Sequence, residues 1–286
     1  MKPDVKAFFH KPTYTVSYVV ADPESRKAVI IDSALDYDHA AGSTATTTAD
    51  EIIAFVREQK YSIEFILETH VHADHLTAAP HLQRQLGGRI GIGARVSTVQ
   101  STFKKIYNFG DDVAEDGSQF HVLFDDGEIF HVGGLRIEVM ATPGHTPACI
   151  TYIIGDAAFI GDTLFMPDYG TARCDFPGGD ARILYRSIRK ILALPPETRL
   201  FLCHDYAPNG REYLWETTVA EQRAKNIHIH DGVSEDEFVK MRTERDKTLS
   251  MPALIIPSIQ VNMQAGHLPP PEENGIAYLK VPLNAL

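Results

Sequence analysis

The segment His70-Val71-His72-Ala73-Asp74-His75 places three imidazoles and a carboxylate within six residues. It comes soon after residues 63–67, a short apolar run of the kind that forms a buried strand. A strand that ends in a tight turn can direct such side chains into one pocket, and neutral imidazole together with carboxylate suits zinc or iron. The alternative is a solvated polar loop, but so many titratable groups at such close spacing are unfavourable without an ion. We therefore predict a metal site here.

Three further candidate ligands lie in turns that follow apolar segments. His145 is in Thr-Pro-Gly-His-Thr at 142–146, Asp162 in Phe-Ile-Gly-Asp-Thr at 159–163, and His204 in Leu-Cys-His-Asp-Tyr at 202–206. Each would more often be structural when taken alone, but loops that leave strand ends are where the ligands of a common site would lie. The remaining histidines occur singly or as an alternating pair on a strand, and we interpret them as surface or satisfied core residues: His10, His39, His81, His121, His131, His228, His230 and His267.

Hydrophobic periodicity alternates between strand-like and helix-like segments, which predicts an α/β fold built in layers. Strands are predicted at 14–20, 27–31, 63–67, 90–92 and 200–203, and helices at 78–86, 95–103, 181–193, 217–226 and 234–249. Turn residues within 122–160 favour consecutive antiparallel strands. Thr48 and Glu51 have the spacing of a capping box that opens a helix to about 59, and the polar stretch 32–49 before it indicates a long surface loop. We expect one domain over 1–286, with 217–286 as a C-terminal helical appendage and proline-rich tail.

Composition narrows the classes of function. The chain has 286 residues, of which 44% are hydrophobic and 23% charged, as in ordinary globular proteins. A formal charge of -11 argues against nucleic acid as the main partner. No apolar run reaches the ~18 residues of a membrane span, and residues 1–11 lack the apolar core of a signal peptide. With three cysteines the chain fits a reducing compartment, so we expect it to be cytoplasmic.

The order of these motifs resembles the metallo-β-lactamase superfamily over residues 14–206. The resemblance implies an αββα sandwich of two mixed sheets flanked by helices, with a metal site at one edge. For dinuclear members it implies that one metal is held by His70, His72 and His145, and the other by Asp74, His75 and His204, with Asp162 between them.

Within the superfamily the finer resemblance is to the persulfide dioxygenases, carried by residues 68–75, 170–176 and 204–206. The glyoxalase II branch has a Gly-Gly pair after its histidine motif, where this chain has Leu76-Thr77-Ala78-Ala79. The resemblance implies one Fe(II) per chain, bound by His70, His145 and Asp162, and oxidation of glutathione persulfide with O₂ to sulfite and glutathione. Spacing alone does not decide between iron and zinc.

Other side chains are expected to act around that ion. His72, Asp74, His75 and His204 would either hold a second metal or orient ligands and water. Tyr206 and Asp74 are the candidate catalytic groups, and Tyr206 and Arg173 the candidate substrate contacts. Arg173 has two equal interpretations, an ion pair with a glutathione carboxylate or one with Asp175 in its own loop. Cys174 we interpret as structural.

Two other functions stay open from sequence. A dinuclear zinc hydrolase of a thioester (as in glyoxalase II), a lactone or a β-lactam would need the same seven side chains and two Zn(II). A scaffold without chemistry is disfavoured because the ligand set is intact. Residues 261–266 contain no cysteine, although some persulfide dioxygenases have one near the C-terminus. By resemblance alone, a sulfurtransferase partner would be a separate protein and the C-terminal segment could support a homodimer.

Overall fold

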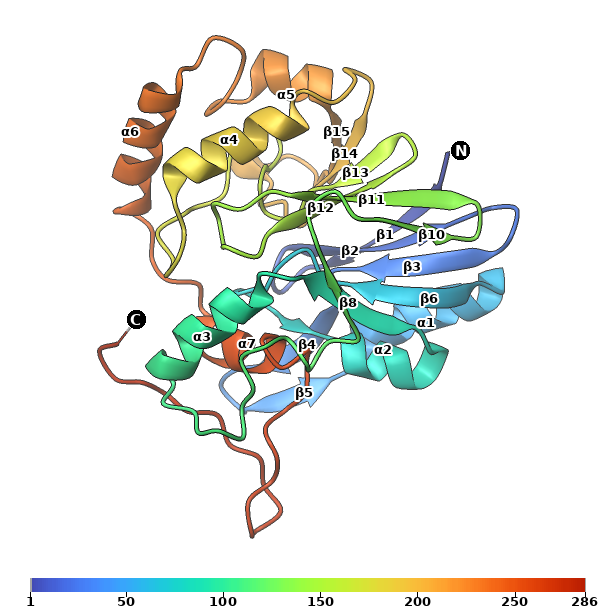
Figure 1. Ribbon diagram of the computed structural model, residues 1–286, viewed down its shortest axis with the longest axis vertical. Helices are drawn as coiled ribbons and strands as arrows, with labels where there is room; N and C mark the ends of the chain where they lie inside the picture. Colours follow the sequence, from blue (N-terminus) through green and yellow to red (C-terminus); the bar gives the residue numbers. More distant parts are fainter. Residues whose placement is uncertain (1, 286) are drawn as a thin grey trace.

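The computed structural model describes residues 2–285 and arranges them in four layers, α, β, β and α (Figure 1). The outer layers consist of helices. One comprises α1 (Thr47–Gln59), α2 (Ala79–Leu86), α3 (Val96–Ile106) and α7 (Ile255–Asn262). The other comprises α4 (Ala181–Ile191), α5 (Val219–Lys225) and α6 (Glu235–Asp246). The αββα sandwich expected from the resemblance is confirmed.

The two inner layers are six-stranded sheets that use separate parts of the chain. The first has, in spatial order, β1 (Asp4–His10), β2 (Thr15–Ala21), β3 (Lys27–Ile31), β6 (Ser62–Leu67), β8 (Arg89–Gly93) and β9 (Val122–Phe124). The second has β10 (Ile129–Val132), β11 (Leu135–Ala141), β12 (Ile150–Ile154), β13 (Ala157–Phe159), β14 (Arg199–Phe201) and β15 (Glu216–Thr218). Along the chain, all strands of the first large sheet come before all strands of the second, and residues 125–128 connect the two sheets.

A hydrophobic core fills the space between the sheets, because alternate residues of each strand point inward. Val16, Tyr18 and Val20 of β2 face Tyr152 of β12 and Phe159 of β13 across this space. The Tyr18 ring lies edge-on to Phe159, and its hydroxyl donates to a backbone oxygen of residue 202. Each such aliphatic side chain contributes roughly 1.5–3 kcal/mol when buried. This core holds in register the strand ends that carry the candidate ligands.

Several local predictions are wrong because tertiary contacts decide them. The predicted loop 32–49 contains β4 (Ala34–Asp38) and β5 (Ser43–Ala45), which join β7 (Leu76–Thr77) in a small third sheet. The capping box is absent, since the Thr48 backbone N–H and hydroxyl both donate to Asp36 at 3.0 Å. Residues 122–124 form β9, which pairs parallel with β8 in the first sheet, while β10 to β13 are antiparallel as predicted.

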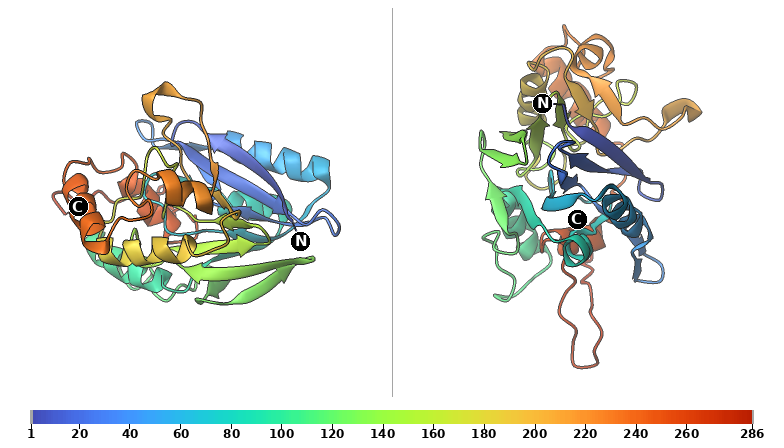
Figure 2. Two further views of the ribbon diagram at one scale, coloured as in Figure 1. Left: turned by 90° about the horizontal axis from the view of Figure 1, so that it is seen from above. Right: turned by 90° about the vertical axis from the view of Figure 1, so that its right-hand side faces the viewer.

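The C-terminal part of the chain is more ordered than its sequence indicated. α7 lies within the predicted proline-rich tail and is almost wholly buried. His228 and His230 lie in the non-strand segment after α5, so the interpretation as a strand pair is wrong. Beyond α7 the chain forms a loop that projects from the layers (Figure 2), and it exposes Ile276, Tyr278 and Val281.

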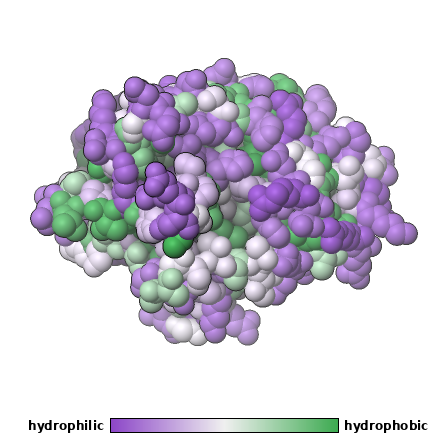
Figure 3. Space-filling view, turned by 90° about the horizontal axis from the view of Figure 1, so that it is seen from below, coloured by the Kyte–Doolittle hydropathy of each residue, from purple (hydrophilic) through white to green (hydrophobic). Residues whose placement is uncertain are grey.

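The face of the molecule seen from below is mainly polar. Figure 3 shows hydrophilic residues over most of this face, with hydrophobic ones in smaller groups. Among residues 2–285, no helix has the length and apolar character that crossing a bilayer requires.

Candidate functional site

The predicted site residues converge at one edge of the sandwich, where strands of both sheets end. The loop after β6 supplies the first histidine cluster, the turn between β11 and β12 supplies His145, and the segments after β13 and β14 supply Asp162 and His204. Both sheets therefore contribute to the site.

His70, His145 and Asp162 form the first of two groups of candidate ligands. One ligand atom of each lies within 4.8 Å of the others, and all three side chains are buried. The Asp162 Oδ2 atom lies 3.7 Å from His70 Nε2 and 3.6 Å from His145 Nε2. Among the described residues, neither His70 Nε2 nor Asp162 Oδ1 has a hydrogen-bond partner. Buried polar atoms rarely stay unpaired, so this convergence fits a bound cation.

The opposite ring nitrogens of both histidines are fixed by hydrogen bonds. His145 Nδ1 donates to the carbonyl oxygen of Arg173 at 2.7 Å. His70 Nδ1 lies 3.0 Å from Thr69 Oγ1, and Thr69 donates its hydroxyl to Asp32 at 2.8 Å and its backbone N–H at 2.7 Å. These contacts leave both Nε2 atoms free to bind a metal, the arrangement found around metal-ligating histidines.

The turn before His145 is fixed against helix α4. Gly144 has φ +134°, and a Cβ added there would lie 2.3 Å from the Leu184 Cα atom. Ser187 donates its hydroxyl to the carbonyl oxygen of Pro143 at 2.6 Å. Only glycine allows this close approach, so the Pro-Gly-His motif serves to seat the turn on the helix.

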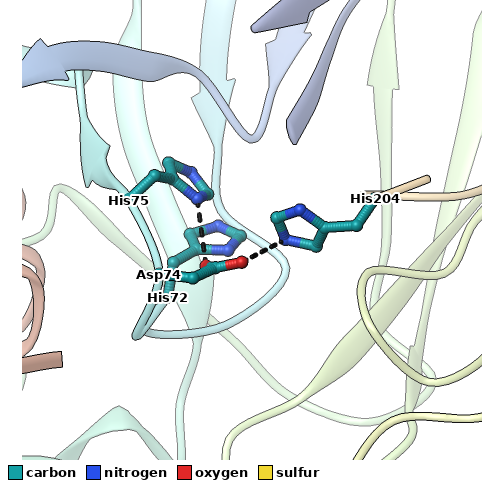
Figure 4. Close-up of side chains that lie close together, drawn as sticks. All are labelled: His72, Asp74, His75 and His204. Atoms are coloured by element: carbon teal, nitrogen blue, oxygen red, sulfur yellow. Dashed lines mark hydrogen bonds and ion pairs between the residues drawn. The ribbon is translucent and has the colours of Figure 1, made fainter. Parts of the chain in front are cut away.

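Figure 4 shows the second group, which consists of His72, Asp74, His75 and His204. Asp74 is central, with one carboxylate oxygen 3.3 Å from His75 Nδ1 and the other 3.0 Å from His204 Nε2. His204 Nε2 also lies 3.3 Å from Asp162 Oδ1, which links the two groups. The Nε2 atom of His75 is buried without a partner among the described residues. A cation also fits this position.

The pKa values of His204 and His75 in the second group are shifted in opposite directions. Burial lowers the pKa of His204, but Asp162 and Asp74 raise it to about 9, so without a bound metal this ring is cationic at neutral pH. Burial and the neighbouring His72 lower the pKa of His75 to about 3, so that ring is neutral. The protonated His204 lies between two carboxylates. It can therefore supply the positive charge that a second metal would otherwise provide there.

His72 is held from behind by two carboxylates that sequence reasoning missed. Its Nε2 donates toward Asp32 and Glu68, both at 3.1 Å. Although burial opposes it, these carboxylates raise the pKa of His72 well above its ordinary value. Glu68 also accepts from Thr77 at 2.6 Å. The position of Glu68 just before the cluster was the only signal in the sequence.

Asn262 of α7 is another contributor that sequence reasoning missed. Its side-chain amide donates to the carbonyl oxygens of His72 at 2.8 Å and His75 at 2.7 Å, and its oxygen accepts from the Thr77 backbone N–H at 2.9 Å. Helix α7 thus holds in place the loop that carries the first histidine cluster.

A cavity of about 390 Å³ opens over both groups and is lined by Asp74, His145 and Asp162 at its inner end. This volume suits a small molecule. Five aromatic side chains contribute to its wall, those of Tyr14, Phe165, Tyr169, Phe176 and Tyr206. The Tyr206 ring is stacked on His204 with 6.0 Å between centroids. Burial raises the pKa of Tyr206 well above its ordinary value, so its hydroxyl remains a donor.

Arg173 and Cys174 lie in the loop that borders this cavity. The Arg173 Nε and Nη2 atoms donate to Asp175 at 2.6 and 2.8 Å, and Nη1 donates to the carbonyl oxygen of Ser250 at 2.7 Å. Of its two sequence-based interpretations, the structure contains the pair with Asp175; a substrate contact stays a prediction. Cys174 is buried against Asp246, and burial raises the pKa of its thiol, which suits packing rather than nucleophilic attack.

Known proteins are similar to this chain in sequence and in architecture. Residues 10–204 match the family model described as the metallo-beta-lactamase superfamily. A probable metallo-hydrolase of Burkholderia pseudomallei is 56% identical over 99% of both chains, and glyoxylase B2 of Dictyostelium discoideum is 50% identical over 100% of this chain and 98% of its own. The mitochondrial persulfide dioxygenase ETHE1 of Bos taurus is 31% identical over 93% of this chain and 90% of its own. The crystal structure of ETHE1 from Myxococcus xanthus has a TM-score of 0.73 at 29% identity, covering 92% of this chain and 100% of that one.

Proposed function

Because this chain belongs to the metallo-β-lactamase superfamily, we propose that it is an iron-dependent persulfide dioxygenase acting on glutathione persulfide. The observation that carries the proposal is the group of His70, His145 and Asp162, two imidazoles and one carboxylate, in which His70 Nε2 and Asp162 Oδ1 are buried without a hydrogen-bond partner among the described residues. Such a set typifies non-haem iron oxygenases, because it leaves coordination positions open. The likeness to the persulfide dioxygenases of Bos taurus and Myxococcus xanthus supports the same choice.

A bound Fe(II) would supply the positions at which a persulfide sulfur and dioxygen react. The overall reaction is RSSH + O₂ + H₂O giving RSH, sulfite and two protons. In this proposal the protonated Tyr206 donates a hydrogen bond to the bound sulfur, and the aromatic wall limits access of water. Asp74, fixed between His75 and His204, orients the water by accepting a hydrogen bond from it.

A second candidate is a dinuclear zinc hydrolase of a thioester, lactone or β-lactam. It is favoured by the intact second group of His72, Asp74, His75 and His204, and by relatives at 50–56% identity that are named glyoxylase or metallo-hydrolase. In that case two Zn(II) would supply a nucleophilic hydroxide at neutral pH.

Metal analysis and activity assays separate the candidates. The purified protein from iron-replete cells should contain about one iron and little zinc per chain, and it should consume oxygen when given glutathione persulfide. Two zinc ions per chain together with rapid hydrolysis of S-lactoylglutathione would instead establish the hydrolase. A useful control is the variant Asp162→Ala, which should lose both the metal and the activity under either candidate.

A further inference from the structure

A second, smaller cavity lies beside the loop 70–75 that carries the first histidine cluster. Its volume is about 10 Å³, which is room for one small molecule. Three parts of the chain line it with buried apolar side chains, namely this loop, helix α3 and helix α7: Val71, Ala73, Val99, Phe103, Ile255 and Ile259. Such a lining favours a small apolar ligand.

Water is a poor occupant of this cavity. Thr146 is the only polar side chain among the lining residues that the structure describes. Its hydroxyl lies 3.1 Å from Cys149 Sγ and accepts from the Ala148 backbone N–H at 3.3 Å, so it already has partners. A buried water typically makes about three hydrogen bonds to polar groups, and apolar cavities that lack them stay dry and take up small apolar molecules.

The cavity is next to the ligand groups because both are built on the same loop. Val71 and Ala73 alternate in sequence with His70, His72 and Asp74. Both apolar residues belong to the same hydrophobic core as the inner faces of α3 and α7. The loop therefore presents imidazole and carboxylate atoms to the metal groups and methyl groups to the cavity.

Two side chains separate this cavity from the larger one over the ligand groups. Ala73 and Phe176 line both cavities. The Phe176 ring lies edge-on to the His145 ring, with 5.5 Å between centroids. On the outer side, Pro147 and Pro177 line the small cavity and are partly exposed. A small molecule therefore has a path from the surface at the two prolines to His145 that does not cross the larger cavity.

We propose that this small cavity binds dioxygen and passes it to the metal position between His70, His145 and Asp162. The inference rests on the proposed function and concerns how the second substrate arrives. A persulfide bound over the ligand groups occupies the larger cavity, so dioxygen needs a separate route. Dioxygen is small, uncharged and apolar and enters an apolar cavity readily, whereas burying water or a persulfide anion there carries a large desolvation cost.

Xenon is the probe for binding, because it is apolar, close to dioxygen in size and visible in a crystal of the holoenzyme kept under xenon pressure. We expect one xenon atom in this cavity. Val99→Ile adds one methylene to the lining and should abolish xenon binding. Val96→Ile makes the same change one turn earlier in α3, at a buried residue that does not line the cavity, and should leave xenon bound. Phe103→Leu enlarges the cavity and should raise xenon occupancy.

Delivery is tested with an oxygen electrode. Val99→Ile should raise KM for dioxygen about threefold with KM for glutathione persulfide unchanged, and Val96→Ile should match the unmodified protein. The inference is overturned if no xenon enters the cavity of the unmodified protein. It is also overturned if Val99→Ile excludes xenon but leaves KM for dioxygen unchanged, or if Val96→Ile raises this KM equally. Absence of oxygen uptake by the unmodified protein would refute the proposed function and with it the delivery, while the xenon result would still decide whether the cavity binds a gas.

Discussion

Replacement of Asn262 by leucine tests whether the C-terminal helix organises the metal loop. The side chain is 4% exposed and makes three hydrogen bonds to the backbone at His72, His75 and Thr77. Leucine has nearly the same size but no polar atoms, so it leaves two carbonyl oxygens and one N–H buried and unpaired. At about 1–3 kcal/mol for each such group, we expect a loss of about 4 kcal/mol in the free energy of unfolding.

The same change should weaken metal binding, because loss of contacts that orient ligands typically costs about 10–100-fold in affinity. Urea unfolding of metal-free protein measures the first effect, and competition with a chelator measures the second. Leu192→Ala is the matched control, since Leu192, at the C-terminal end of α4, is buried in a core cluster that contains no residue of this loop. It should cost a similar ~2–5 kcal/mol without changing metal affinity. The reasoning is refuted if Asn262→Leu loses stability but binds metal as tightly as this control does.

Three further outcomes are expected. Asp162→Ala should abolish metal loading, whereas His204→Ala should retain iron if one ion is bound; loss of iron in both variants would contradict that assignment. Gly170→Ala should shift the loop whose carbonyl oxygen holds His145, since φ is +98° and the new Cβ would lie 2.1 Å from the His228 ring; metal affinity should fall about tenfold by chelator competition. Burial and two nearby arginines lower the pKa of His228 to about 4, below its ordinary 6.5. Because protonation then favours the unfolded chain, up to about 3 kcal/mol of stability present above pH 6.5 should disappear as the pH falls to 4. His228→Asn should flatten this part of the stability curve, and an unchanged curve would refute the assignment.

The sequence predicted the parts of the site that are local. Histidines and carboxylates that directly follow apolar runs stand out by position, which predicted that they share one rim, and the family resemblance singled out His70, His145 and Asp162 among them. The partners that hold those ligands were not, since Asn262 contacts His72 across 190 residues. Nothing in the stretch around Asn262 distinguishes it from a surface asparagine.

Pairing partners explain the other failures. Thr48 and Glu51 have the spacing of a helix cap, but the Thr48 hydroxyl donates a hydrogen bond to Asp36 instead. For Arg173 the sequence left two interpretations open, and the structure contains the pair with Asp175. Residues 122–124 have a strand pattern that fits either sheet, and their parallel partner β8 precedes α3. In each case the local pattern gives the type of element or contact, and distant residues select the partner.

The single passage of the strands between the large sheets has a consequence for biosynthesis. A ribosome releases β1 to β9 and the His70–His75 loop before any part of the second sheet exists. At that stage the inner side of the first sheet has no cover, and the loop lacks His145 and Asp162. Metallation must therefore await the second half of translation, and the nascent chain is a natural client for chaperones during that interval.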